Sequence, residues 1–243
     1  METQTNMTPR QVDFKFGEYI SQGIDLMKKD FGTILLSFIF ALILGIIPFC
    51  GLVAFGNFYK ICHKIDKGIP VEASEIFNFD DFMPYFIFQL YIFGACMLLI
   101  IPYVFLMVFS GNDGVVSGVV SGIISIVLVA AYFFLIYFIL QAFYIPALIT
   151  FKKITDVKTA WNISKVMTKG NLWMILFFSI VVTFLGELGI ILCGIGIFLT
   201  IPFIYVSHYF AFKDGLAQLE TVDKQVIETS VYSLCKSFLE FYV

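Results

Sequence analysis

The chain has 243 residues, of which 60% are hydrophobic and 14% are charged, and its mean hydropathy is +0.93. A soluble domain of this length cannot bury so much apolar surface, so the composition excludes a soluble globular protein. The formal net charge is −3 and the sequence has no basic patch, which argues against nucleic acid as a partner.

Six apolar segments are candidates for membrane-spanning helices. A bilayer core of about 30 Å needs about 20 apolar helical residues, because unpaired backbone groups are too costly in hydrocarbon. The segments are roughly 32–48, 51–66, 85–110, 116–148, 171–188 and 192–212. Lys60 interrupts the second segment, so it is either a full span or half of a re-entrant loop. The predicted fold class is an all-α integral membrane protein with six transmembrane helices in three hairpins.

The basic residues decide the orientation and favour a full span over 51–66. All fifteen Lys and Arg residues fall on one side of the membrane if the six segments cross it. The turns left on the other side, near 49–51, 111–114 and 187–192, carry only Asp113 and Glu187 as charges. Because Lys and Arg are retained on the cytoplasmic side, both termini are predicted to be cytoplasmic.

Each predicted hairpin is preceded by a segment with helical periodicity that is too polar to cross. The apolar faces contain Phe16, Tyr19, Ile20, Ile24, Met27 and Phe31 in the first, Ile76, Phe79, Met83 and Phe86 in the second, and Val157, Ala160, Trp161 and Met167 in the third. These segments are expected to be amphipathic helices in the cytoplasmic headgroup layer, and the alternative is soluble connectors packed on the bundle. Their aromatic content favours the interface.

The chain is predicted to form one six-span membrane domain, 1–215, followed by a cytoplasmic amphipathic tail, 216–243. Its first and last hairpins resemble each other, since the sequence MKKDFGTILLSF in the first is similar to MTKGNLWMILFF in the last. Both copies run in the same direction, so the sequence predicts a parallel internal repeat. Secondary transporters more often contain inverted repeats.

Small residues and prolines suggest how the spans pack. Gly114, Gly118 and Gly122 recur every four residues, a spacing that lets helix backbones approach closely. They form either a homodimer face or, as favoured here, a contact with a neighbouring span of the same chain. Pro102 and Pro202 are expected to kink their helices, since each removes one backbone hydrogen bond.

Few polar residues fall within the predicted spans. The candidates are Asn57, Gln89, Gln141 and His208. No Asp, Glu, Lys or Arg is expected at mid-depth, where ion and proton carriers usually place one.

The sequence predicts no catalytic, cofactor-binding or metal site. It has only two histidines, and its five cysteines form no CxxC pair. Cys62, His63 and Asp66 are expected to point in different directions around a helix, which is poor geometry for a nucleophile and its base. Cys50 and Cys193 fall near outer turns and either pair or, as favoured, remain packing thiols.

The last hairpin carries a recurring pattern of short motifs. They are Trp161 to Ser164, Gly170 to Trp173, Gly194 to Gly196, Thr200 to Pro202, and Phe212 to Asp214. The pattern resembles poorly characterised bacterial multi-pass membrane proteins and the membrane domain that some glycerophosphoryl diester phosphodiesterases carry ahead of their catalytic barrel. The resemblance implies a bacterial inner-membrane location and a link to lipids, and it transfers no active-site residue.

These features favour a non-enzymatic integral inner-membrane protein with an accessory, envelope-organising or lipid-associated role. Membrane lipids are its expected partners, and a membrane-protein partner and a homo-oligomer remain open. The alternative is a carrier for a small apolar or lipid-like solute, which a solvent-connected cavity between the first and last hairpins would favour. An intramembrane enzyme ranks last, because it would need Asn57, Gln89, Glu187 or His208 to meet at mid-depth.

Overall fold

The computed structural model describes residues 11–109, 115–191, 196, 198 and 200–219. These residues form helices joined by short turns, and no β-strand occurs among them. The predicted all-α fold is therefore confirmed. The elements are α1 (Phe16–Lys29), α2 (Phe31–Ile46), α3 (Gly51–Asp66), the 3-10 helix η1 (Ala73–Phe77), α4 (Phe82–Phe109), α5 (Val115–Gln141), α6 (Ile145–Lys152), α7 (Val157–Met167), α8 (Leu172–Glu187), the 3-10 helix η2 (Leu188–Ile191) and a last helix over 200–219.

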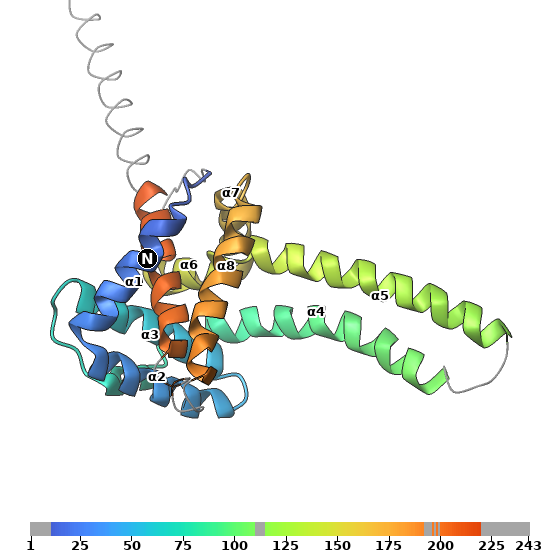
Figure 1. Ribbon diagram of the computed structural model, residues 1–243, viewed down its shortest axis with the longest axis horizontal. Coiled ribbons are helices and arrows are strands. Elements are labelled where there is room, and N and C mark those ends of the chain that lie inside the picture. The colour runs from blue at the N-terminus through green and yellow to red at the C-terminus, as the bar shows by residue number, and fades with distance from the viewer. Residues whose placement is uncertain (1–10, 110–114, 192–195, 197, 199, 220–243) are drawn as a thin grey trace, which may run out of the picture.

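The helices form a bundle from which one long hairpin projects. In Figure 1, α1, α2, α3, α6, α7, α8 and the 200–219 helix gather together, and the α4–α5 hairpin extends away to one side. The 200–219 helix belongs to the core of the bundle, since Val206, Tyr209 and Ala211 are fully buried. Its Tyr205 ring stacks on Phe55 of α3 with the ring centroids 4.3 Å apart.

The projecting hairpin supplies the helices that are long and apolar enough to cross a bilayer. Two segments meet that description in the part of the chain that the structure describes, Phe82–Phe105 in α4 and Gly122–Lys152 in α5 and α6. The number rises to four if each of two bent helix pairs, α1 with α2 and α7 with α8, counts as one span. The structure therefore contains two to four candidate spans, where the sequence predicts six.

Helix length accounts for three of the predicted spans, and the sixth, 192–212, lies partly outside the described residues. α2, α3 and α8 each have 16 residues. At 1.5 Å per residue such a helix is about 24 Å long, which is shorter than the bilayer core of about 30 Å. The three predicted hairpins also do not stand parallel, because α4 and α5 lie across the direction of α8 and the 200–219 helix in Figure 1.

Two of the three predicted amphipathic helices are present as separate elements. α1 turns into α2 at an angle of 101°, and α7 turns into α8 at 98°. Each pair is therefore joined by a nearly right-angled bend, and the location of α1 and α7 in the headgroup layer stays a prediction.

The second predicted amphipathic helix, over Ile76 to Phe86, is wrong. Ile76 belongs to the short helix η1, and α4 begins only at Phe82. Between them, Asn78 Nδ2 donates to Asp80 Oδ2 at 2.8 Å, and the Asp80 amide donates to Asn78 Oδ1 at 2.9 Å. Such local side-chain hydrogen bonds compete with the helical backbone pattern and produce a turn here.

The predicted boundary between domain and tail falls inside a helix. The 200–219 helix continues past residue 215, and Leu216 and Leu219 are buried against the bundle. The remainder of the predicted tail, 220–243, lies outside the described residues.

Candidate functional site at the base of the hairpin

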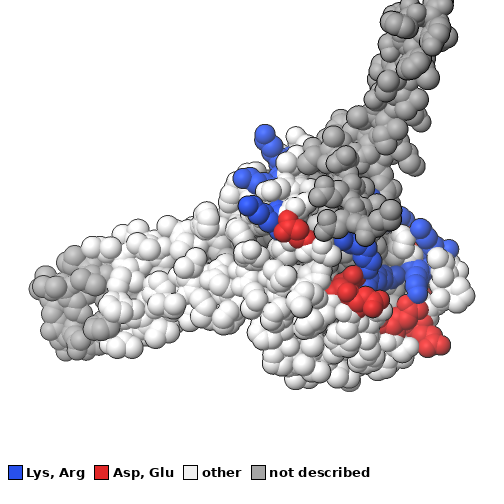
Figure 2. Space-filling view, turned by 180° about the vertical axis from the view of Figure 1, so that it is seen from behind, with Lys and Arg blue, Asp and Glu red and all other residues white. Residues whose placement is uncertain are grey.

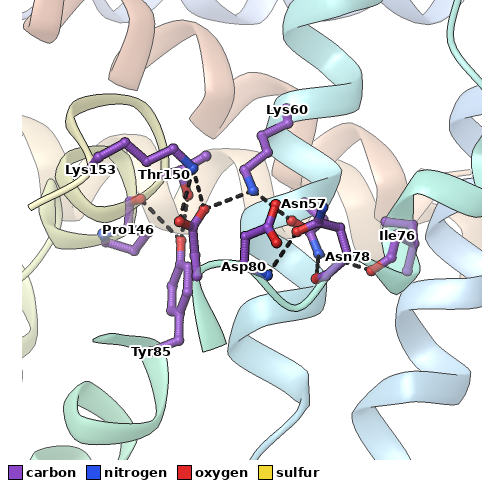
Figure 3. Close-up of polar contacts among 10 residues, drawn as sticks. Asn57, Lys60, Ile76, Asn78, Asp80, Tyr85, Pro146, Thr150 and Lys153 are labelled. Carbon is purple, nitrogen blue, oxygen red and sulfur yellow. Dashed lines mark hydrogen bonds and ion pairs between the residues drawn. The ribbon is translucent and has the colours of Figure 1, made fainter. Parts of the chain in front are cut away.

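A buried carboxylate joins the hairpin to the bundle. Asp81 immediately precedes α4, and its side chain is only 10% exposed. The Lys60 ammonium of α3 lies 2.7 Å from Asp81 Oδ2. The ammonium of Lys153, which follows α6, lies 2.8 Å from Oδ1 and 2.7 Å from Oδ2. One carboxylate thus receives two cations from helices on different sides of it, and Figure 3 shows Lys60 and Lys153 approaching from opposite directions.

Asn57 extends this network along α3. Its Nδ2 donates to the carbonyl oxygens of Ile76 at 2.9 Å and Asn78 at 2.5 Å, while its Oδ1 accepts from Lys60 at 2.9 Å. Asn57 is 2% exposed. Its Nδ2 therefore holds η1 and the following turn against α3, while its Oδ1 binds Lys60 of the same helix, as Figure 3 shows.

Tyr85 fixes the first turn of α4 against α6. Its hydroxyl donates to the Pro146 carbonyl at 3.0 Å, and Thr150 Oγ1 lies 2.6 Å from the same hydroxyl oxygen. The ring lies so close to α3 that a Cβ at Gly56 would come within 2.6 Å of it. Glycine is therefore needed at position 56 to let the tyrosine ring pack.

The other predicted polar residues do not join this network. Gln89 Oε1 is buried and has no hydrogen-bond partner among the described residues. Gln141 is 7% exposed, and its backbone carbonyl accepts from Ser164 Oγ at 2.6 Å. His208 Nδ1 donates to the Ile204 carbonyl at 2.6 Å. Its ring packs against the rings of Phe143, Phe178 and Phe212.

A second polar cluster, which the sequence did not predict, lies between α3 and the 200–219 helix. Tyr209 donates its hydroxyl proton to Asp66 Oδ2 at 2.8 Å, and His63 Nδ1 lies 3.0 Å from the hydroxyl oxygen. Lys213 pairs with the same carboxylate oxygen of Asp66 at 2.5 Å. The expectation that Cys62, His63 and Asp66 diverge is thus wrong for the last two. They are three residues apart, share one face of α3 and meet Tyr209.

The predicted packing residues are only partly described. Gly114 lies outside the described residues, and Gly118 and Gly122 fall within α5. A Cβ added at Gly122 would meet no atom within 4 Å, so the favoured contact with the same chain is not present there.

Both prolines lie within continuous helices, and the kinks expected at them stay predictions. Pro102 lies inside α4, which continues to Phe109, and Pro202 is buried within the 200–219 helix. Next to it, Thr200 Oγ1 donates to the carbonyls of Gly186 and Gly196.

Neither a metal cluster nor a converging polar site emerges from these positions. Across the described residues, no group of three or more His, Cys, Asp or Glu side chains is placed to hold a metal ion. The hydrogen bonds of this same part of the chain connect no two of Asn57, Gln89, Glu187 and His208. Cys50 carries a free thiol, and its suggested partner Cys193 lies outside the described residues.

Fold and site together define an all-helical protein with apolar helices compatible with membrane insertion. Its polar network holds these helices to a charged bundle. Comparisons with models of protein families, with curated proteins and with solved structures find no match. The resemblance to the membrane domain of glycerophosphoryl diester phosphodiesterases accordingly stays a prediction.

Proposed function

We propose that the chain is a non-enzymatic integral protein of the bacterial cytoplasmic membrane, anchored by the α4–α5 hairpin and associated with lipid at the hairpin base. The observation that carries the proposal is the separation of apolar and charged surface. α4 and α5 contain no Asp, Glu, Lys or Arg, whereas the bundle carries the ion pairs. Figure 2 shows charged side chains on the bundle and an uncharged hairpin surface.

The exposed surface of the hairpin supports a lipid environment. Leu98, Ile126 and Phe134 are 73%, 72% and 67% exposed. A continuous apolar surface of this length is unfavourable in water and indicates contact with a partner or a membrane. Hydrocarbon can cover it without any further protein.

We propose further that the chain crosses the membrane six times, as expected from the sequence. α2 and α8 both present apolar residues outward, among them Ile46 at 82% and Trp173 at 83% exposure. Helices of this length would enter a bilayer that thins locally around them. Two crossings and six crossings both place the two ends of the chain on the same side, where the basic residues attract the anionic leaflet.

Cysteine labelling tests the topology. In a variant without native cysteines, single cysteines at positions 113, 187, 64 and 158 are treated with an impermeant maleimide on spheroplasts. Labelling at 113, with 64 and 158 protected until the membrane is permeabilised, is expected. Labelling at 187 as well supports six crossings, whereas protection at 187 restricts the crossings to the hairpin. Protection at 113 together with labelling at 158 would contradict the orientation.

A lipid or apolar-solute carrier is the second candidate, and one cavity favours it. A cavity of about 350 Å³ lies between α1–α2 and the last helices. Its lining includes Ile24, Met27 and Phe31 on one side and Leu185 and Phe203 on the other. A carrier would accelerate the movement of a fluorescent lipid across reconstituted vesicles and lose this activity when Phe203→Trp fills the cavity. A protein that only associates with lipid would match empty vesicles.

A further inference from the structure

The base of the hairpin contains a second cavity, which is an apolar groove with a single cation at its edge. It has a volume of about 300 Å³ and lies between α4, α5 and α7. Phe88 and Tyr91 line it from α4, Phe138 from α5, and Val157, Lys158 and Trp161 from α7. This volume is at the lower end for small-molecule sites and suits part of one acyl chain better than a whole lipid.

The aromatic side chains give the groove a fixed wall and a definite depth. The Trp161 ring stacks on Phe138 with the centroids 4.2 Å apart. Phe88 is 6% exposed at the floor, whereas Tyr91 is 59% exposed at the rim. Trp and Tyr prefer the boundary between headgroups and hydrocarbon, because their rings are apolar and their N–H and O–H groups are polar.

The charge at the rim selects among possible occupants. Lys158 is exposed, and no carboxylate of the described residues lies within ion-pair distance of its ammonium. The adjacent Asp156 directs its carboxylate to the start of α7, where it accepts from the amides of Lys158 and Thr159 at 3.3 and 2.9 Å. The groove therefore combines an apolar lining with one exposed, unpaired cation, which complements an anionic headgroup attached to an acyl chain.

We infer that this groove binds one anionic phospholipid of the cytoplasmic leaflet, with the phosphate at Lys158 and an acyl chain between Tyr91 and Trp161. The inference rests on the proposed placement of the hairpin in the bilayer and adds the lipid class and the site. An uncharged amphiphile would leave Lys158 without a partner, and a free phosphate would leave the aromatic channel empty. A phospholipid with a net negative charge satisfies both ends.

Tryptophan quenching tests the inference on the full chain in vesicles. Trp173 is 83% exposed on α8, so Trp173→Phe leaves Trp161 as the only tryptophan with little disturbance of packing. The vesicles contain the same mole fractions of phosphatidylglycerol and phosphatidylcholine throughout, and bromine is placed on the acyl chains of one lipid or the other. At equal mole fractions of the brominated lipid, the extent of Trp161 quenching shows which headgroup class occupies the groove.

Brominated phosphatidylglycerol is expected to occupy the groove with about a fivefold preference over brominated phosphatidylcholine, the size of effect that one basic side chain near an anionic surface supplies. Lys158→Gln should abolish this preference. Lys165→Gln is the matched control, because Lys165 is exposed on the same face of α7, two turns further along, and does not line the groove. It should keep the preference. Variants are compared only where their circular dichroism and thermal unfolding match the parent.

The outcomes separate this inference from the proposed function. Equal quenching by both lipids would overturn the groove assignment while leaving the hairpin in the bilayer. A preference that survives Lys158→Gln, or that Lys165→Gln removes to the same extent, would show attraction to the whole basic face and would also overturn it. No quenching by either lipid would place Trp161 away from acyl chains and overturn the groove assignment too, whereas the insertion of the hairpin itself is tested by the labelling at position 113.

Discussion

Removing the carboxylate of Asp81 is expected to loosen the joint between hairpin and bundle. In Asp81→Ala, Lys60 keeps only Asn57 Oδ1 as an acceptor, while Lys153, whose side chain is 58% exposed, turns to solvent. Removing one partner of a buried ion pair costs about 3–5 kcal/mol, and an exposed pair contributes about 0–1 kcal/mol. The Lys60 pair lies between these cases, since Lys60 is 24% exposed and Asp81 is 10% exposed. We expect a loss of about 2–3 kcal/mol.

Thermal unfolding in a mild detergent, followed by circular dichroism, measures this loss. For a chain of this size each kcal/mol shifts Tm by about 2–4 °C, so Asp81→Ala should lower Tm by about 4–12 °C. Asp80→Ala is the matched control, because Asp80 is exposed and bonds only within its own turn, and it should stay within about 0.5 kcal/mol of the parent. If the two variants unfold at the same temperature, the reasoning that places a buried ionic joint here is refuted.

Two further substitutions test the packing of α3 and the cap of α7. Gly56→Ala should cost about 1–3 kcal/mol, because its Cβ would approach the buried Tyr85 ring to within 2.6 Å, whereas Gly32→Ala, with no atom within 4 Å, should be neutral or slightly stabilising; equal Tm values would contradict this. Hydrogen bonds from the Thr159 hydroxyl and amide lower the pKa of Asp156, so its capping contribution is complete above the unfolded pKa of about 3.9 and disappears as the pH falls through the lower folded value. Asp156→Ala should therefore cost about 1 kcal/mol at neutral pH and converge with the parent in strong acid, as pH-dependent Tm measurements would show; a difference that persisted at low pH would exclude this cap.

The long apolar helices could be predicted from the sequence because the information is local. The segments 85–110 and 116–148 coincide closely with α4 and with α5 continued by α6. Both are uninterrupted apolar runs without a charged residue, so composition and length alone identify them. The same criteria overestimate the ability of the shorter segments to cross the bilayer. These segments form 16-residue helices with one face packed on the bundle.

The polar joint could not be predicted because its pairs are distant in sequence. Lys60 was the reason to doubt a continuous helix over 51–66, yet Asp81 neutralises it from 21 residues away and Lys153 reaches the same carboxylate over 72 residues. By contrast, the three-residue spacing of His63 and Asp66 was a usable signal for a shared helix face. Only their meeting with Tyr209, 146 residues from His63, required the fold.

The polar side chains at the base of the hairpin already have hydrogen-bond partners, and this determines what kind of ligand could bind there. Asn57 uses both its amide donor and its oxygen, and the Tyr85 hydroxyl contacts two oxygen atoms. A site for a polar solute needs donors and acceptors that are still free to bind it, since unpaired buried polar groups are costly in the empty state. The joint therefore holds helices together, and the apolar rings and unpaired Lys158 of the neighbouring groove suit the proposed lipid better than a polar solute.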